Sequence, residues 1–301
     1  MQVPVVLLWL LSGGPAPSLA PSSPAAPSHQ VPPAQAEFGY PDGVALGRDG
    51  SLYVVDTDNS VVKKLSPAGE ITTVLCTNLK YPTGVALGPD GTLYVADAGS
   101  RAVWRLAPAA TVPDKLTGRG FTYPSAVAVA PDGTLYVADA GTAAGGSVQK
   151  ISPAGRVEVL ARNLHKPSGI ALGADGAVYV AESTTNTIQK ITPTGQTSVA
   201  AQGLVLDQPH GLAMGTDGVL YVADSYHHRV LTISPAGRVA TLATGFSYPS
   251  GLAVDAAGTV FVADTGHNTL KRVSAAGAIS AVLAPAIDIK ASVASPQPTK
   301  P

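Results

Sequence analysis

Histidine is the residue type that points most directly to chemistry in this sequence, because imidazole binds divalent metals and exchanges protons near neutral pH. His210, His227 and His228 lie close together in the chain, and His267 follows them. One hypothesis is that His210, His227 and His267 hold a divalent metal. The alternative is that these side chains make local hydrogen bonds or lie in solvent. No other cofactor is predicted.

A second set of candidate residues consists of tyrosines that directly precede a recurring proline. Its members are Tyr40, Tyr81, Tyr123 and Tyr248. Tyrosines gathered on one surface offer flat, rigid contacts to a ligand. Alternatively, each ring packs between neighbouring repeats and leaves its hydroxyl in water. Asp42 lies two residues after Tyr40 and could join a polar rim around the same surface.

The composition argues against several classes of protein. The 301 residues include 19 basic and 20 acidic side chains, for a net charge of −1. Proteins that bind nucleic acids usually carry a positive excess that neutralises phosphates, so we expect no nucleic-acid partner. The single cysteine, Cys76, excludes an intrachain disulfide and a metal site with several cysteines. The sequence has no serine-hydrolase elbow, phosphate-binding loop or HExxH motif.

The elements that position these residues come from six copies of one sequence unit, marked by two independent features. The first is a proline, at Pro41, Pro82, Pro124, Pro167, Pro209 and Pro249. The second is an acid that ends a YVAD-like segment, at Asp56, Asp97, Asp139, Glu182, Asp224 and Asp264. Both features recur at the same spacings of 41, 42, 43, 42 and 40 residues. Two markers in the same register indicate true repeats.

Each unit contains four short apolar segments, exemplified by GVALG, LYVAD, VVKKL and EITTVL. Their β-branched and aromatic residues favour strands, and the Asp-Gly and Ser-Pro-Ala-Gly sequences between them favour tight turns. Four-stranded units of about 42 residues are typical of propeller blades. The sequence therefore predicts an all-β, six-bladed β-propeller of four-stranded antiparallel blades. The repeated acid is expected to accept hydrogen bonds from its own loop rather than bind calcium.

The unit resembles the NHL repeat. The resemblance lies in Pro-x-Gly-[Val/Leu/Ile]-Ala followed by Asp-Gly-x-[Leu/Val]-Tyr-Val-Ala-Asp, and QPHGLAMGTDGVLYVADSYHHRV is among the closest stretches. It covers residues 38–284 and implies a single propeller similar to the extracellular sensor domains of bacterial receptor kinases. The family also includes RNA- and protein-binding modules and a zinc-dependent lyase, so the resemblance does not fix the function.

In that lyase, metal-binding histidines directly follow the blade prolines. Here only His210 occupies such a position. The other five positions hold Asp42, Thr83, Ser125, Ser168 and Ser250. The lyase's set of histidines is therefore not matched in this sequence.

The two ends of the chain are expected to lie outside the fold. Residues 1–20 contain a seven-residue apolar run, which is too short to span a bilayer and is typical of a signal peptide. Residues 21–37 are predicted to be a Pro/Ala/Ser linker, and residues 285–301 a flexible tail. We expect a secreted, cell-surface or periplasmic protein with no membrane span in this chain. A truncated leader or membrane anchor is the alternative.

The strand order places the loops between units, and the loops after the repeated acid, at one end of the propeller. We call this the variable-loop end, because uniform tight turns occupy the other. Binding sites usually lie on variable loops held by a rigid scaffold, so we expect a ligand here. The candidate ligand-binding residues are Tyr40, Asp42, Tyr81, Tyr123, His210, His227, His228, Tyr248 and His267.

The hypothesis that these observations favour is a monomeric binding or sensing module for a protein, peptide or small molecule. No catalytic residue is assigned. The alternative is a metal-dependent lyase or hydrolase with a histidine-containing site at the same end. The ring must also close between its first and last units. That closure occurs either by side-chain packing alone or through an extra strand from Gln35–Phe38 or Ile287–Val293.

Overall fold

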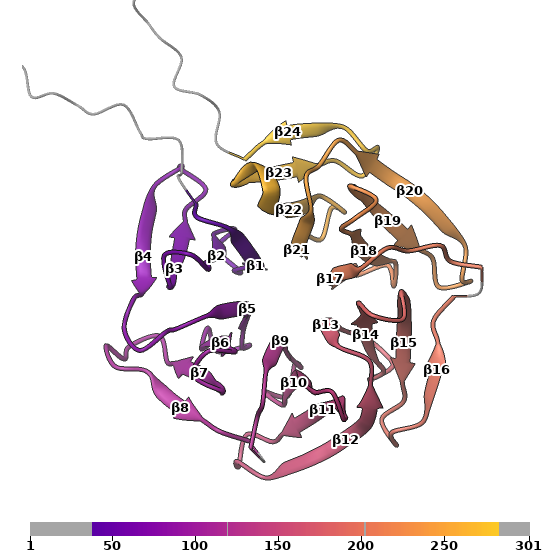
Figure 1. The fold of residues 1–301 in the computed structure, drawn as a ribbon. Helices are drawn as coiled ribbons and strands as arrows, with labels where there is room; N and C mark the ends of the chain where they lie inside the picture. Colours follow the sequence, from indigo (N-terminus) through magenta and orange to yellow (C-terminus); the bar gives the residue numbers. More distant parts are fainter. Residues whose placement is uncertain (1–37, 119, 202, 283–301) are drawn as a thin grey trace, which may run out of the picture. The chain divides into compact units, whose positions relative to one another are not determined.

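The computed structural model describes residues 38–118, 120–201 and 203–282, which form a six-bladed β-propeller (Figure 1). Each blade is an antiparallel sheet of four consecutive strands. The first strand of each blade lies nearest the central channel and the fourth lies at the periphery (Figure 1). The predicted fold class is therefore confirmed. The segments 1–20, 21–37 and 285–301, for which a signal peptide, a linker and a tail are expected, lie outside the described residues.

The first three blades follow one another along the chain. Blade 1 contains β1 (Pro41–Leu46), β2 (Leu52–Asp56), β3 (Val61–Leu65) and β4 (Ile71–Leu75). Blade 2 contains β5 (Pro82–Leu87), β6 (Leu93–Asp97), β7 (Ala102–Leu106) and β8 (Asp114–Leu116). Blade 3 contains β9 (Pro124–Val129), β10 (Leu135–Thr142), β11 (Gly145–Ile151) and β12 (Val157–Leu164).

The last three blades repeat the same plan. Blade 4 contains β13 (Pro167–Leu172), β14 (Val178–Glu182), β15 (Thr187–Ile191) and β16 (Thr197–Val199). Blade 5 contains β17 (Pro209–Met214), β18 (Leu220–Asp224), β19 (Arg229–Ile233) and β20 (Val239–Thr244). Blade 6 contains β21 (Pro249–Val254), β22 (Val260–Asp264), the short 3₁₀ helix η1 (Thr265–His267), β23 (Thr269–Val273) and β24 (Ile279–Ala281).

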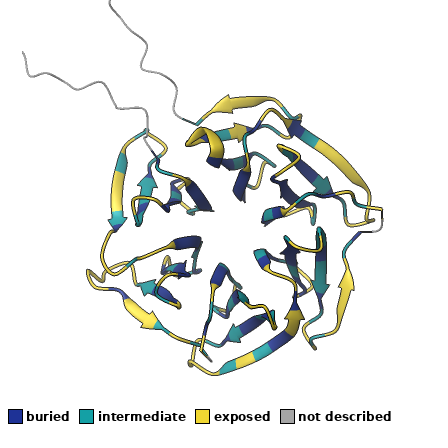
Figure 2. Cartoon of the chain, viewed as in Figure 1, coloured by how far each residue is buried: buried dark blue, intermediate teal, exposed yellow. Residues whose placement is uncertain are grey.

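Burial decreases from the channel outward, as Figure 2 shows. The second strand of each blade is covered on both faces by the neighbouring blades, so consecutive residues such as Val54 and Val55 are both fully buried. All three residues of the outer strands β16 and β24 are exposed. Strands buried on both faces read as continuous apolar runs, and this explains the low share of charged residues in the sequence. Within the described ranges, no helix has the length and apolar character needed to cross a membrane.

Hydroxyl groups join each blade to the next near the channel. In every case a Ser or Thr donates to the carbonyl oxygen of the proline that opens the next blade, and we call these donors joint hydroxyls. In blades 2, 3 and 4 the donor directly follows the blade's own proline. These donors are Thr83 (to Pro124, 3.3 Å), Ser125 (to Pro167, 2.6 Å) and Ser168 (to Pro209, 2.8 Å).

The other three blades take the joint hydroxyl from the residue after the repeated acid. The donors are Thr57 (to Pro82, 3.0 Å), Ser225 (to Pro249, 2.6 Å) and Thr265 (to Pro41, 2.7 Å). In blade 6, Ser250 also lies 3.3 Å from the carbonyl oxygen of Pro41. Blade 6 therefore has a hydroxyl at both positions.

The glycine of the Pro-x-Gly unit is explained by the close approach of neighbouring blades. A Cβ on Gly169, Gly211 or Gly251 would overlap a carbonyl oxygen of the next blade. Any larger residue would have to push the first strands of the two blades apart.

The ring closes between blades 6 and 1 without a shared strand among the described residues. Phe38 is buried in a cluster that contains Val44 of blade 1 and Ala263 of blade 6. The joint hydroxyl of Thr265 and a hydrogen bond from the Tyr40 N–H to Asn268 Oδ1 (3.0 Å) reinforce this contact. Among the described residues, packing and hydrogen bonds together close the ring. Residues 35–37 and the segment Ile287–Val293 lie outside them, so an extra strand from either segment stays a prediction.

Candidate functional site

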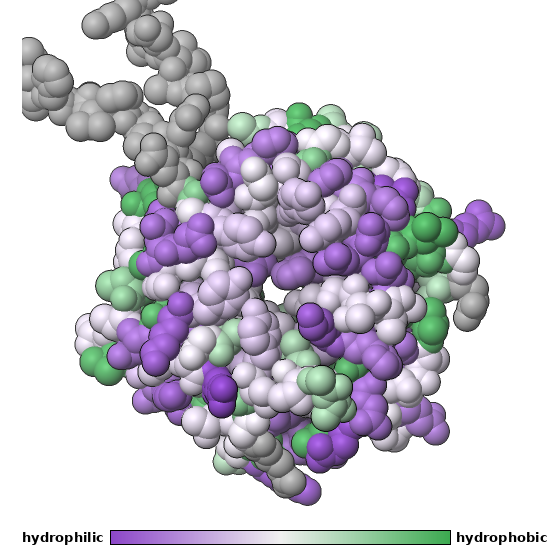
Figure 3. All heavy atoms as spheres, in the orientation of Figure 1, coloured by the Kyte–Doolittle hydropathy of each residue, from purple (hydrophilic) through white to green (hydrophobic). Residues whose placement is uncertain are grey.

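A cavity of about 870 Å³ opens at the variable-loop end. Loops from all six blades line it, and Figure 3 shows the central opening of the ring among mainly polar to neutral residues. Six of the nine predicted ligand-binding residues line this cavity, namely Tyr40, Asp42, Tyr81, Tyr123, His210 and Tyr248. His227, His228 and His267 are not among its lining residues.

Tyrosine rings form much of the cavity wall. A fifth tyrosine, Tyr226, stacks edge-on against Tyr248 with ring centroids 5.1 Å apart, and Tyr81 lies 6.5 Å from Tyr123. All five rings are 40–48% exposed, so they are available for contact. Burial of the phenol raises the pKa of Tyr123 to about 12, so this hydroxyl stays neutral and can donate a hydrogen bond at physiological pH. Sequence reasoning missed Tyr226, although its place in a variable loop was a usable signal.

His228 has a structural role in this wall. Its Nδ1 accepts the backbone N–H of Tyr248 at 3.2 Å, and its ring packs edge-on against the Tyr248 ring. Tyr248 has φ of 49°, an unfavourable left-handed conformation for a residue with a side chain, so it needs such support. Asn268 supports Tyr40 (φ 58°) in the same way. His228 thus helps to orient a tyrosine that faces the cavity.

His227 and His267 are held by the repeated acids of their own blades. His227 Nδ1 lies 2.9 Å from Asp224 Oδ2, and His267 Nδ1 lies 2.8 Å from Asp264 Oδ2. The structure does not bring these rings together with His210. In the part of the chain that is described, no group of three His, Cys, Asp or Glu side chains could hold a metal ion. The described residues therefore do not fit the hypothesised metal site.

The expectation that the repeated acid bonds its own loop is confirmed in five of the six blades, and the structure adds a second donor. Asp56 accepts Asn59 Nδ2 (2.8 Å) from the following loop, and it also accepts the Gly39 N–H (2.7 Å) from the start of the same blade. Equivalent backbone N–H groups bond the acid in every other blade. In five blades the acid therefore ties together the two loops that form the variable-loop end. In blade 2, Asp97 instead accepts Trp104 Nε1 from β7 at 3.2 Å.

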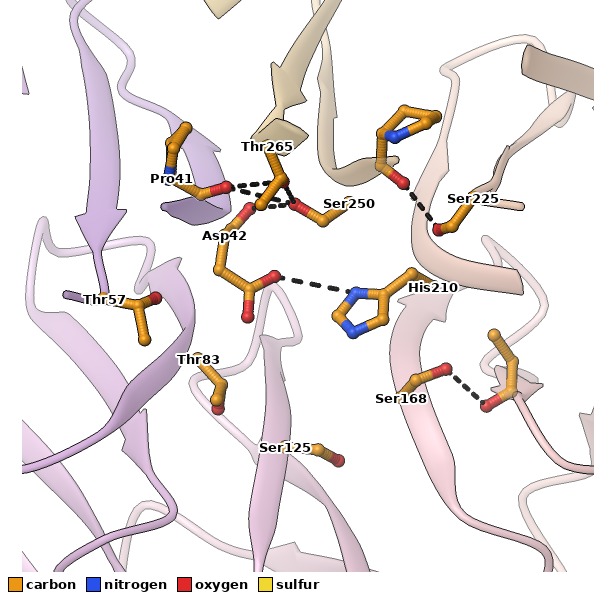
Figure 4. Close-up of polar contacts among 12 residues, drawn as sticks. Pro41, Asp42, Thr57, Thr83, Ser125, Ser168, His210, Ser225, Ser250 and Thr265 are labelled. Carbon is orange, nitrogen blue, oxygen red and sulfur yellow. Dashed lines mark hydrogen bonds and ion pairs between the residues drawn. The ribbon is translucent and has the colours of Figure 1, made fainter. Parts of the chain in front are cut away.

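The central feature of the cavity is a pair that faces across the channel. His210 on β17 points its Nδ1 toward Asp42 Oδ1 on β1, at 3.6 Å (Figure 4). Asp42 is 6% exposed, whereas the His210 side chain is 37% exposed. Burial raises the pKa of Asp42, and the His210 imidazole and the Ser250 hydroxyl oppose this rise. A buried carboxyl with a perturbed pKa beside an accessible imidazole is typical of a functional site.

The raised pKa of Asp42 predicts that the stability of the fold depends on pH. The native state binds this proton more tightly than the unfolded chain, so the stability contributed by Asp42 falls as pH rises from about 4 through its raised pKa. We expect Asp42→Asn to raise Tm at neutral pH, by an amount that shrinks on acidification to about pH 3. Thermal unfolding of both proteins across this pH range measures the difference. Identical Tm curves would contradict the prediction.

The fold and the cavity together define a six-bladed propeller with a small-molecule-sized site at the mouth of its channel. The chain belongs to the virginiamycin B lyase family, whose model matches residues 22–273. The NHL assignment is thus not confirmed, and the repeats belong to a related type of propeller. Among curated proteins, none matches the sequence significantly.

Solved structures share the fold at low sequence identity. Virginiamycin B lyase from Staphylococcus aureus, solved as a catalytically inactive histidine-to-alanine form with quinupristin, is 17% identical with a TM-score of 0.64, over 82% of this chain and 85% of that chain. A gluconolactonase from Xanthomonas campestris is 20% identical with a TM-score of 0.66, over 75% and 83% of the two chains. A chain of the nidogen/laminin complex is 21% identical with a TM-score of 0.61, over 67% and 79%. At these identities the likeness shows the fold alone.

Proposed function

We propose that the protein is an enzyme of the lyase or hydrolase type, with His210 as the group that accepts a proton and Asp42 as its partner. The observation that carries the proposal is the pairing of these two side chains across the channel, within the wall of the cavity at the variable-loop end. Their separation of 3.6 Å is longer than a hydrogen bond, but catalytic contacts are often this long before substrate binds. We also propose, from the sequence alone, that the protein is exported and monomeric.

The geometry suits general-base chemistry. Because Asp42 faces Nδ1, His210 is left with Nε2 to accept a proton from a bound molecule. In an elimination, Nε2 takes the proton from a carbon and the C–H electrons form a double bond. The C–O bond on the neighbouring carbon breaks, and its electron pair leaves with the oxygen as a carboxylate. In a hydrolysis, Nε2 takes a proton from water, and the water oxygen attacks an ester or lactone carbonyl. The acyl C–O bond then breaks, and the departing alkoxide oxygen takes the proton back from the imidazolium. Both routes use the same pair of residues.

Family membership favours an enzyme over a binding module. The family is named for a lyase, and one propeller of similar fold is a gluconolactonase. The tyrosine wall supports a small neutral molecule with a flat or apolar face as substrate, because aromatic rings contact such faces well. A purely sensory role would use the same wall without turnover.

A turnover assay separates these functions. The purified protein is incubated with quinupristin and, separately, with gluconolactone, and the products are followed by mass spectrometry while binding is followed by thermal shift. Elimination within a ring leaves the mass unchanged, whereas hydrolysis adds one water. Product formed by either route supports an enzyme. Binding without any product, extended to a panel of esters and lactones, would favour the sensing module instead.

A further inference from the structure

The cavity at the variable-loop end is built from two rings of equivalent residues, one from each blade. The first ring consists of the residues that directly follow the blade prolines, and it includes Asp42 and His210. The second ring, which we call the rim ring, consists of the residues that directly precede these prolines. All six members of the rim ring line the cavity, namely Tyr40, Tyr81, Tyr123, Lys166, Gln208 and Tyr248.

The backbone holds Lys166 in the same conformation as two of the rim tyrosines. Its φ is 49°, equal to that of Tyr248 and close to the 58° of Tyr40. A residue with a side chain rarely adopts this left-handed conformation unless its neighbours fix it. Ser183 fixes Lys166, because its N–H and its Oγ both donate to the carbonyl oxygen of Lys166, at 3.2 and 3.1 Å. The Lys166 side chain therefore starts from a fixed point on the cavity wall.

Lys166 also determines the charge of the wall. It is the only lysine or arginine among the described residues that line the cavity, and the only acid there is Asp42, which is buried and faces His210. The Lys166 side chain is exposed, and within the described ranges no acid forms an ion pair with it. Its ammonium group is therefore available to an anion that enters the cavity. Other lysines are paired with acids, namely Lys63, Lys64, Lys190 and Lys271.

The rim ring gives the cavity two different sides. Blades 6, 1, 2 and 3 carry the tyrosines, whereas the neighbouring blades 4 and 5 carry Lys166 and Gln208 (Figure 1). His210 lies on the polar side, in blade 5. Ser168, two residues after Lys166, donates to the carbonyl oxygen of Pro209, directly before His210, at 2.8 Å. The free cation and the proposed base thus come from adjoining first strands.

Both routes of the proposed reaction place negative charge on acyl oxygens. The elimination releases the acyl group as a carboxylate. The hydrolysis first charges the carbonyl oxygen and then yields a carboxylic acid, which is ionised at neutral pH. A lysine ammonium has three N–H donors and binds such oxygens through charge-assisted hydrogen bonds. A cation next to the base suits a reaction that develops this charge.

We propose that the substrate is a neutral ester or lactone with an apolar face, and that Lys166 binds the acyl oxygens that become negatively charged. The apolar face contacts the rim tyrosines, so the acyl group is directed toward blades 4 and 5, where His210 lies. The role of Lys166 in the reaction rests on the proposed function. The binding of a carboxylate at Lys166 does not, because it requires no turnover.

Two small probes test the assignment without turnover. Phenylacetate has an aromatic face and the carboxylate of a product, and phenylacetamide is its neutral amide of the same shape. The Kd of each probe is measured by ligand-observed NMR at low and high salt for wild type, Lys166→Gln, Lys166→Arg and Lys80→Gln. Lys80 is an exposed lysine directly before the rim residue Tyr81, but it is not part of the cavity lining, so Lys80→Gln is the matched control. Tm checks the folding of each variant.

Wild type is expected to bind phenylacetate about tenfold more tightly than phenylacetamide, and salt should reduce this preference. Lys166→Gln should raise the Kd of phenylacetate about tenfold and change that of phenylacetamide by less than about twofold, because only the charge-assisted contact is lost. Lys166→Arg should keep most of the preference, since it keeps the charge. Lys80→Gln should behave as wild type. On a substrate identified by product analysis, Lys166→Gln should lower kcat/KM at least about tenfold.

Three results would overturn the assignment of Lys166. The first is a Kd for phenylacetate that does not change in Lys166→Gln. The second is an equal loss of affinity for both probes, which would indicate a structural effect. The third is an unchanged kcat/KM in Lys166→Gln, which would leave the proposed enzyme intact. Phenylacetate binding that depends on Lys166, in a protein without turnover, would keep the assignment and count against the proposed function.

Discussion

Replacing His210 by asparagine is expected to lower kcat/KM by about 10²–10⁴-fold, the usual contribution of a general base. Asparagine is polar and of similar size, but it cannot accept a proton near neutral pH. The fold should tolerate the change, because His210 is not a joint residue and Ser225 bridges blades 5 and 6. Steady-state kinetics on the substrate found by product analysis, with Tm as a check of folding, measures the effect.

The control for this variant is His267→Asn. It removes an imidazole from the same end of the propeller, but from a ring that bonds Asp264 and is not part of the cavity lining. Its kcat/KM should stay within about twofold of wild type, since no group that touches the substrate is changed. Equal losses in the two variants would mean that the imidazole of His210 has no special role.

Replacing Asp224 by alanine is expected to lower the free energy of unfolding by about 3–5 kcal/mol. This fully buried carboxylate accepts the Asp207 N–H (2.8 Å) and Arg229 Nε (2.7 Å), and it contacts His227 Nδ1 (2.9 Å). Alanine would leave these polar groups without their partner. Denaturant unfolding of the wild type and the variant measures the loss.

A second aspartate provides the matched control. Asp114 forms an ion pair with Arg105 at 2.8 Å, but its side chain is 67% exposed, so Asp114→Ala should cost no more than about 1 kcal/mol. If Asp224→Ala were no more destabilising than Asp114→Ala, the repeated acid would not be what organises the loops of the variable-loop end.

The fold could be predicted from the sequence because the same strand and turn pattern occurs in six successive units. The register of Pro41 and Asp56 is kept in every unit, and the structure pairs these two residues or their equivalents across the first two strands of each blade. The turn residues and the burial of the strands favour the same four-stranded blade. Such agreement between local and global preferences is the condition for a sequence to specify one structure.

The candidate site could be predicted only in part. The sequence identifies the end at which the cavity opens and four of the tyrosines that line it, but it treats His227 and His267 as candidate ligands. Comparison of the repeats could have distinguished these two histidines from His210. Both stand three residues after the repeated acid, where Asn59 and Thr185 make the same local hydrogen bond in their own blades. The pairing of Asp42 with His210 was not predictable from the repeat alone. These residues are 168 positions apart, and the curvature of the ring determines which first strands face one another across the channel.

The joint between blades 6 and 1 also has a consequence for how the chain could be rearranged. Asp42 lies in the first blade and His210 in the fifth, so the shorter path between them around the ring crosses blade 6 and its packed contact with blade 1. A circular permutant that joins the last blade to the first and opens the loop between blades 2 and 3 would carry both residues on one continuous segment. In such a molecule the geometry of the pair would no longer depend on a non-covalent closure.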